Sequence, residues 1–169
     1  MVTRIGSCLA AVIGLLLAAT TPAPAQIVAI GASNVAGRGV SSVDAWPAQL
    51  EAMLAAKGRH IHVANAGING DTNARMLARL DSAVPSGTKI VLLDRKGGGW
   101  NGRRLRQGAQ EAELAAIEAR LRARHITVIP MWWGAGLRQY LQPDHIHFTP
   151  EGHRLVATHM LGPVLRAVR

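Results

Sequence analysis

Residues 26–34 read Gln-Ile-Val-Ala-Ile-Gly-Ala-Ser-Asn, an apolar run that ends in a turn of small residues. The apolar part, residues 26–30, predicts a buried β-strand, because a short run dominated by aliphatic residues fits a strand that is covered on both faces. The turn Gly31-Ala32-Ser33-Asn34 then presents a serine hydroxyl just after the strand. The segment therefore predicts both the first strand of a sheet and a candidate nucleophile.

Outward from this segment, strand-like runs alternate with helical patterns. Further strands are predicted at residues 60–64, 89–93 and 126–130, and helices at residues 46–56, 71–80, 110–124 and from residue 150 onward. Asp71 is expected to be the N-cap of the 71–80 helix, and Thr149 the N-cap of the last helix, with Pro150 at its first position. This alternation predicts an α/β fold of three layers (α/β/α), in which helices cover both faces of a central parallel sheet.

The first 25 residues have the pattern of a secretory signal peptide. Arg4 supplies a positive charge, residues 9–20 are uncharged and mostly apolar, and Ala23-Pro24-Ala25 is a small-x-small cleavage site. The apolar run is shorter than the ~20 residues that a membrane span needs. We therefore expect residues 1–25 to be a signal peptide, residues 26–169 to form one domain, and the protein to be periplasmic or secreted without a stable membrane anchor.

The composition argues against several classes of function. Cleavage after Ala25 would remove Cys8, the only cysteine, and with it any disulfide, thiol nucleophile or cysteine-based zinc site. The formal net charge is +9, but the basic residues are spread thinly along the chain, which argues against a nucleic-acid partner. Residues 31–39 lack the spacing of a nucleotide-binding glycine motif. We expect a monomer that uses no cofactor.

Residues with catalytic chemistry stand at corresponding places along the predicted fold. Ser33 follows the first strand, and Asp144, His145 and His147 lie just before the last helix. Reactive groups of an open α/β sheet gather at the carboxyl ends of its strands, so these side chains should lie close together. A serine becomes an effective nucleophile when a histidine takes its proton and a carboxylate orients that histidine. The pattern therefore indicates a serine hydrolase.

Four blocks of the sequence, spread over nearly the whole predicted domain, resemble the SGNH or GDSL hydrolases. The turn Gly31-Ala32-Ser33-Asn34 is similar to the Gly-Asp-Ser-Leu turn of the family, with Ala32 in place of the aspartate. Residues 65–72, Asn-Ala-Gly-Ile-Asn-Gly-Asp-Thr, resemble the block that supplies an oxyanion-binding glycine, with Gly70 in that place. The two remaining blocks lie farther along the chain.

The third block of the family is Gly-x-Asn-Asp, and Gly98-Gly99-Trp100-Asn101 is its nearest match, with the asparagine shifted by one position. The Asp-x-x-His block appears as Asp144 to His147, with His145 where the family commonly has a glycine. The resemblance implies a flavodoxin-like three-layer fold and an activity of the esterase, acyl-CoA thioesterase or lysophospholipase kind.

The resemblance also implies a role for each matched residue. Ser33 would attack an acyl carbonyl, His147 would remove its proton, and Asp144 would orient the ring of His147. The backbone N–H groups of Ser33 and Gly70 and the side-chain amide of Asn101 would hold the oxyanion. His145 competes with His147 for the base role; the Asp-x-x-His spacing favours His147 and leaves His145 to line the substrate site.

A metal site is the alternative that the histidines offer. His145, His147, His153 and His159 lie close together in the sequence. However, His159 stands six residues beyond His153, off a shared helical face, and the chain has no His-Glu-x-x-His pattern. We therefore expect no metal.

Tryptophans are the candidates for lining the substrate site. Trp100 adjoins Asn101, whereas Trp132 and Trp133 follow the fourth predicted strand, where they can either fill the core or form an apolar wall for an acyl group. Residues 131–143 leave little chain for a lid, which favours a short acyl chain on a small-molecule ester. Two other interpretations stay open: a catalytically impaired binding protein of this fold, and a carbohydrate O-acetyl esterase acting on cell-wall or extracellular polysaccharide.

Overall fold

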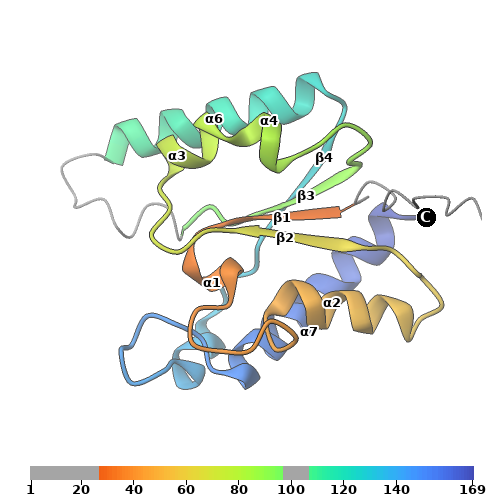
Figure 1. Ribbon diagram of the computed structural model, residues 1–169, viewed down its shortest axis with the longest axis vertical. Coiled ribbons are helices and arrows are strands. Elements are labelled where there is room, and N and C mark those ends of the chain that lie inside the picture. The colour runs from red at the N-terminus through yellow and green to blue at the C-terminus, as the bar shows by residue number, and fades with distance from the viewer. Residues whose placement is uncertain (1–26, 97–106) are drawn as a thin grey trace, which may run out of the picture.

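The structure, a computed structural model, describes residues 27–96 and 107–169. A parallel sheet lies between two layers of helices (Figure 1). The strands are β1 (Ile27–Gly31), β2 (Val63–Gly67), β3 (Ile90–Leu93) and β4 (Thr127–Pro130). The helices are α1 (Ser33–Ala36), α2 (Trp46–Ala55), α3 (Asn73–Ala78), α4 (Leu80–Ala83), α6 (Gln107–Ala123), the 3-10 helix η2 (Ala135–Tyr140) and α7 (Pro150–Ala167).

The strand order places the first strand inside the sheet. The order is β2-β1-β3-β4, and every neighbouring pair is parallel. In this register Gly31 lies opposite Gly67, and Ile30 lies opposite Leu93. The carboxyl ends of these strands therefore meet at one edge of the sheet, as the sequence predicted, and the segments that follow them converge there.

Alternate side chains of β1 pack into two separate cores. Ile27 and Ala29 face α2 and α7, whereas Val28 and Ile30 face α3, α4 and α6. All five residues of β1 are buried, which explains why this strand reads as a continuous apolar run. Each fully buried aliphatic side chain of this kind stabilises the fold by roughly 1.5–3 kcal/mol. The predicted α/β fold with a central parallel sheet and helices on both faces is confirmed.

The second strand lies three residues later than predicted, at Val63–Gly67 instead of 60–64. Its residues Val-Ala-Asn-Ala-Gly have little intrinsic strand preference beyond the valine. Pairing with β1 sets the register instead, from Ile27 opposite Val63 to Gly31 opposite Gly67. Gly67 also lies against α1 so closely that a Cβ atom there would be 2.2 Å from the backbone nitrogen of Ala36.

The predicted cap at Asp71 is wrong. Thr72 is the N-cap of α3, and its hydroxyl accepts a hydrogen bond from the backbone N–H of Arg75. Asp71 is instead fully buried and paired with Arg79, which stands between α3 and α4. The guanidinium of Arg79 binds the carboxylate that was predicted to cap the helix. The last helix begins as predicted, because Thr149 accepts from the N–H of Gly152 and Pro150 is its first residue.

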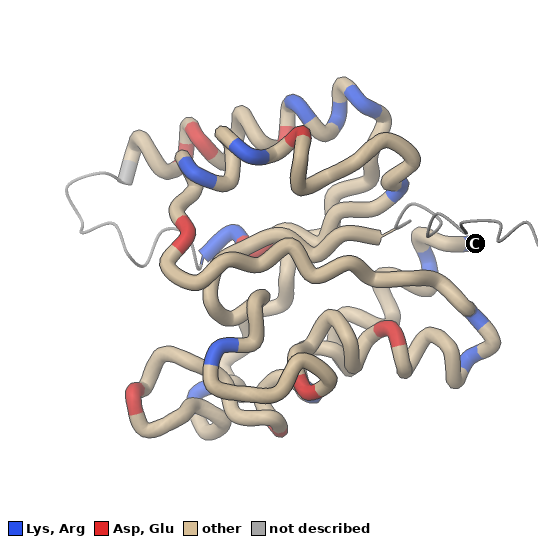
Figure 2. The backbone as a smooth tube through the Cα atoms, viewed as in Figure 1, with Lys and Arg blue, Asp and Glu red and all other residues tan. Residues whose placement is uncertain are grey.

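Charged residues occur in both helical layers, with acidic positions interleaved among the basic ones (Figure 2). Among the helices within residues 27–96 and 107–169, none has the length and apolar character needed to span a bilayer. The predicted signal peptide, residues 1–25, lies outside the described residues, and so do Trp100 and Asn101.

Candidate active site

The nucleophile turn, residues 31–34, joins β1 to α1 within a single residue. Ala32 precedes the helix, and its carbonyl accepts hydrogen bonds from the N–H groups of Val35 and Ala36. Gly31 allows this sharp turn, because a Cβ atom there would lie 2.4 Å from Val35 Cγ2 and 2.5 Å from Asp94 Cβ. Ser33 is consequently the first residue of α1 and lies at the carboxyl edge of the sheet.

The His147 loop, residues 141–148, is folded mainly by its own hydrogen bonds. Leu141 and Phe148 form an antiparallel bridge at its base, and the N–H of Gln142 donates to the carbonyl of His147. At its tip, Asp144 Oδ1 accepts from the backbone N–H groups of Ile146 (2.9 Å) and His147 (3.0 Å). The loop therefore holds Asp144 and His147 in a fixed relation to each other.

A chain of hydrogen bonds runs from Ser33 to Asp144. Ser33 Oγ lies 2.9 Å from His147 Nε2, and His147 Nδ1 lies 2.5 Å from Asp144 Oδ2. Ser33 and His147 are 114 residues apart in the sequence, so the fold brings them together. Because Nδ1 faces a carboxylate, the imidazole carries its proton there and presents Nε2 to the serine as an acceptor. In this arrangement the serine proton can pass to the ring.

The residues joined by these hydrogen bonds differ in burial and charge. The side chain of His147 is 8% exposed, whereas that of Asp144 is 44% exposed. The hydrogen bonds from the His147 ring and from the backbone of His147 and Ile146 hold the pKa of Asp144 well below its ordinary value. Asp144 is therefore a carboxylate at neutral pH, and it can stabilise a positive charge on the neighbouring imidazole.

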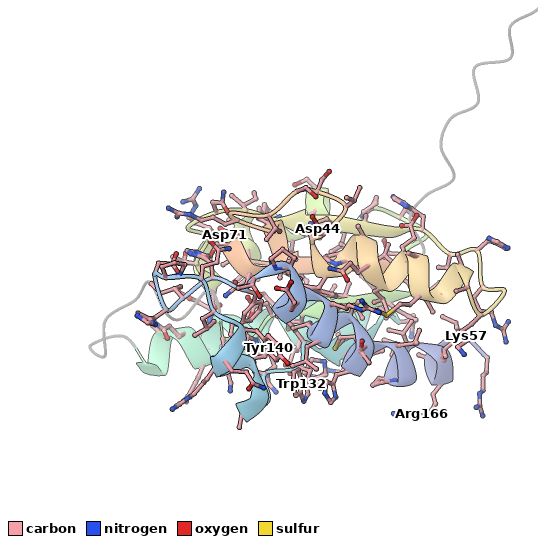
Figure 3. The ribbon with its side chains drawn as sticks, turned by 90° about the horizontal axis from the view of Figure 1, so that it is seen from below. Asp44, Lys57, Asp71, Trp132, Tyr140 and Arg166 are labelled. Atoms are coloured by element: carbon pink, nitrogen blue, oxygen red, sulfur yellow. The ribbon has the colours of Figure 1, made fainter. Side chains whose placement is uncertain are left out.

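The Gly70 loop, residues 67–72, is attached to the ends of β1 and β2. The N–H of Ile68 donates to the carbonyl of Gly31. Arg79 donates from Nε and Nη2 to Asp71 Oδ2, at 2.8 and 2.7 Å, and from Nη2 to the carbonyl of Ala66 at 2.8 Å. Gly70 itself is exposed and has a φ of +72°, a conformation that favours glycine. Figure 3 shows Asp71 toward one end of the molecule and Lys57 and Arg166 at the other.

The structure brings His147, not His145, to the serine. His145 is exposed, has a φ of +57°, and lies in the turn closed by its N–H and the carbonyl of Gln142. Glycine adopts such a φ easily. This explains why the family that this block resembles commonly has a glycine at the position of His145.

Trp132 and Trp133 pack against elements behind the site. The indole of Trp132 stacks on His159 of α7, with ring centroids 3.7 Å apart. His159 lies about 14 Å along the helix axis from Pro150, at 1.5 Å per residue. Trp133 donates from Nε1 to Asp94 and packs at 5.3 Å against Phe148. Both indoles pack against the apolar core. Through its contact with Phe148, Trp133 supports the base of the His147 loop.

Residues that the sequence analysis did not single out hold the two loops in place. Asn34 links the nucleophile turn to the backbone of Ile146 and Phe148, Gln142 links the carbonyls of Arg38 and Phe148, and Arg79 anchors the Gly70 loop. The only signal of such a role in the sequence was the asparagine directly after Ser33. Its role could not be inferred without knowing which loop it contacts.

The histidines of the described residues have separate partners. His153 is buried, its Nδ1 accepts from the backbone N–H of Trp46, and burial lowers its pKa to about 4. Within residues 27–96 and 107–169, no three His, Cys, Asp or Glu side chains group as a metal site requires.

Comparison with known proteins gives related sequences and related folds. Esterase TesA of Pseudomonas aeruginosa is 31% identical over 111 residues, which are 65% of this chain and 55% of TesA. The chain thus spans about half the length of this curated relative.

Three solved structures have the same fold. Esterase EstA from Pseudoalteromonas sp. superposes with a TM-score of 0.71 at 16% identity, over 85% of this chain and 98% of EstA. TesA superposes with a TM-score of 0.68 at 21% identity, over 85% of this chain and 97% of that one. The SGNH-hydrolase family esterase AlinE4 superposes with a TM-score of 0.61 at 23% identity, over 89% and 100%.

The model of one protein family matches residues 29–131, more than half of the chain. This match includes the nucleophile turn and the Gly70 loop. The chain therefore belongs to the GDSL-like lipase/acylhydrolase family, a family of ester-hydrolysing serine hydrolases.

Proposed function

We propose that this protein is an exported serine esterase that cleaves small carboxylic esters through an acyl-enzyme, with Ser33 as nucleophile, His147 as base and Asp144 as the orienting carboxylate. The observation that carries the proposal is the hydrogen-bonded chain from Ser33 Oγ through the His147 ring to Asp144 Oδ2. Its distances lie within the reach that proton transfer requires. Membership of the GDSL-like family supports the same chemistry.

The mechanism follows from the direction of these hydrogen bonds. Ser33 Oγ attacks the acyl carbonyl while its proton moves to His147 Nε2, and Asp144 keeps the Nδ1 proton in place and stabilises the imidazolium. The ring then gives the proton to the departing alkoxide. Water attacks the acyl-enzyme with the help of the same base, which restores Ser33 and releases the acid. General-base help of this kind is typically worth about 10²–10⁴ in rate.

We assign the oxyanion site to the backbone N–H groups of Ser33 and Gly70 and the side chain of Asn101. Ser33 is the first residue of α1, so its N–H has no acceptor within the helix. The N–H of Ile68 ties the Gly70 loop to the end of β1, just before the serine. Asn101 lies outside the described residues, and its assignment depends on the resemblance of its block to the family. Losing one oxyanion donor costs about 10²–10³ in turnover.

For the substrate we propose short acyl esters. Between β4 and the His147 loop the chain forms the short helix η2 and its connections, which is little material for an acyl-chain tunnel. Hydrolysis of p-nitrophenyl acetate and p-nitrophenyl octanoate measures this preference directly. We expect acetate to be the better substrate by kcat/KM.

The test of the mechanism compares the wild-type protein with Ser33→Ala, His147→Ala and His145→Ala on both esters. We expect the first two changes to abolish turnover and the third to retain most of it. Labelling with a fluorophosphonate, followed by peptide mapping, should place the adduct on Ser33. Unlabelled protein without serine-dependent turnover would instead indicate a binding protein of this fold. Loss of activity in His145→Ala alone would overturn the assignment of the base.

Export rests on the signal-peptide pattern of residues 1–25. We expect the full-length chain, expressed in a bacterium, to be recovered from the periplasm or medium with Gln26 at its N-terminus. N-terminal sequencing of that material checks this. Recovery of the intact chain from the cytoplasm would contradict export without touching the serine mechanism.

A further inference from the structure

Asn34 is a buried polar side chain to which the proposed mechanism gives no role. It is the second residue of α1, directly after Ser33, and is 5% exposed. Its Nδ2 donates to the carbonyl of Ile146 at 3.0 Å, and its Oδ1 accepts from the N–H of Phe148 at 3.1 Å. Both the donor and the acceptor of the amide are therefore used, across more than a hundred residues of sequence.

The two backbone groups that Asn34 binds flank His147 on either side. The backbone of His147 itself is engaged within its own loop, where its N–H donates to Asp144 Oδ1 and its carbonyl accepts from Gln142. These internal bonds fix the shape of the His147 loop but not its position relative to Ser33. Asn34 supplies that position, because its amide pairs with the loop as an adjacent strand would.

Few other hydrogen bonds join the His147 loop to this part of the chain. Among the described residues, the side-chain hydrogen bonds that join the loop to residues 31–40 are the Ser33–His147 bond, the two bonds of Asn34, and one bond from Gln142 to the carbonyl of Arg38. A single hydrogen bond contributes only modestly to holding two segments together, because it replaces hydrogen bonds to water. The Ser33–His147 bond alone would therefore be a weak constraint on where the ring lies.

We infer that Asn34 is the positioning residue that sets the 2.9 Å separation between Ser33 Oγ and His147 Nε2, by holding both sides of His147 to the helix that begins at the serine. This role rests on the proposed serine mechanism. Proton transfer depends steeply on this separation, and a misplacement of about 1 Å can cost on the order of 10²-fold in rate. Only a side chain with both a donor and an acceptor at this reach can make the pair.

Two variants and one matched control test the inference. Asn34→Ala removes both hydrogen bonds, and Asn34→Asp keeps the size and the acceptor but loses the donor to Ile146. Gln142→Ala is the control, because it also removes two hydrogen bonds of the same loop, to the carbonyls of Arg38 and Phe148, but leaves the carbonyl of Ile146 and the N–H of Phe148 bound to Asn34. Circular dichroism and thermal unfolding establish which variants fold; the near-isosteric Asn34→Asp serves if Asn34→Ala does not.

We expect Asn34→Ala to lower kcat on p-nitrophenyl acetate by roughly 10–100-fold, with little change in KM, and to slow fluorophosphonate labelling of Ser33 in parallel. Asn34→Asp should also lower kcat. In addition, its carboxylate near the ring should move the acid limb of kcat/KM to higher pH by roughly half a unit or more. Gln142→Ala should lower kcat clearly less than either Asn34 variant. Folded Asn34 variants with kcat within twofold of wild type, or an equal loss in Gln142→Ala, would overturn the assignment.

A second measurement does not depend on turnover. The imidazole nitrogen resonances of His147 are compared by NMR in wild type, Asn34→Ala, Gln142→Ala and Ser33→Ala. We expect Asn34→Ala to move the Nε2 resonance toward its position in Ser33→Ala, because the ring leaves the serine, and Gln142→Ala to resemble wild type. An Asn34→Ala spectrum identical to wild type would refute the positioning role. If the wild-type protein had no serine-dependent turnover, the proposed function would fail, and this comparison would still decide the role of Asn34.

Discussion

The His147 loop and the Gly70 loop are both attached to the nucleophile turn, but different interactions hold them in place. The His147 loop is a small hairpin held by its own backbone hydrogen bonds and by the exposed carboxylate of Asp144. The Gly70 loop is held by an ion pair whose carboxylate is buried, in which Arg79 joins Asp71 to the carbonyl of Ala66. The first loop is held mainly by hydrogen bonds within itself, whereas the second is tied to the strand ends through the buried carboxylate of Asp71.

The two carboxylates show what this difference means. The Asp144 side chain is 44% exposed and the Asp71 side chain 1% exposed, yet it is the exposed one that contacts the histidine of the site. Burial therefore does not identify the carboxylate that pairs with the histidine here. A buried carboxylate requires a permanent counterion, as Asp71 has in Arg79. An exposed one can serve a histidine whose charge appears only during reaction.

The largest effect should come from breaking the exposed pair. We expect Asp144→Asn to lower kcat by roughly 10²–10⁴-fold, because a neutral amide neither stabilises the imidazolium nor holds the productive tautomer. The amide oxygen can still accept from the N–H groups of Ile146 and His147, so the loss of stability should be the smaller effect. Ester hydrolysis beside thermal unfolding measures both. Asp81→Asn, at an exposed site of α4, is the control. Retention of more than a tenth of the activity in Asp144→Asn would contradict the role of this carboxylate.

Breaking the buried pair should act on stability instead. Asp71→Ala leaves Arg79, which is 19% exposed, without its carboxylate. The expected loss in the free energy of unfolding is about 3–5 kcal/mol, measured by urea denaturation. Asp81→Ala, which removes a carboxylate that is 67% exposed, should lose less than about 1 kcal/mol. Equal losses in the two variants would show that the Gly70 loop does not depend on the buried pair.

His153, which packs against Phe148 of the His147 loop, should make the free energy of unfolding depend on pH. The ring of His153 contacts Phe148 edge-on at 5.5 Å, and burial lowers its pKa to about 4. A histidine with a lowered folded-state pKa is protonated first in the unfolded chain, so stability falls as the pH falls from about 6.5 toward 4, by up to about 3 kcal/mol.

Urea denaturation at pH 7 and pH 4.5 measures this loss. His153→Gln has no titrating ring at this position. In this variant the free energy of unfolding should differ less between pH 7 and pH 4.5, by most of that amount. An unchanged difference would mean that other groups cause the acid sensitivity.

The smallest effect is expected at the tip of the His147 loop. His145 has a φ of +57°, a conformation that costs an L-residue roughly 1–2 kcal/mol and glycine almost nothing. Part of that gain is offset by the greater flexibility of glycine in the unfolded chain. We expect His145→Gly to raise stability by up to about 1 kcal/mol and to retain esterase activity, as thermal unfolding and ester hydrolysis would show. A clear destabilisation would indicate that the His145 ring makes a stabilising contact.

Several predicted elements were right because short stretches of sequence encode them. The apolar run before Ser33 is buried on both faces, and Thr149-Pro150 begins the last helix through a local cap. The second strand and the cap at Asp71 were misplaced, since pairing with β1 set the register of β2 and Arg79 took the carboxylate. Both errors occur where a distant residue outweighs a local preference.

The sequence by itself determined the α/β architecture, the serine at the end of β1 and the Asp-x-x-His spacing, because strand burial, helix capping and the separation of two residues within one short loop are local properties of the chain. Only the tertiary structure decided which histidine reaches Ser33, what Asp71 binds, and what Asn34 does. Asn34 and Ile146 are 112 residues apart. A hydrogen bond over such a distance is formed by the packing of whole elements, and no local pattern in the sequence records it.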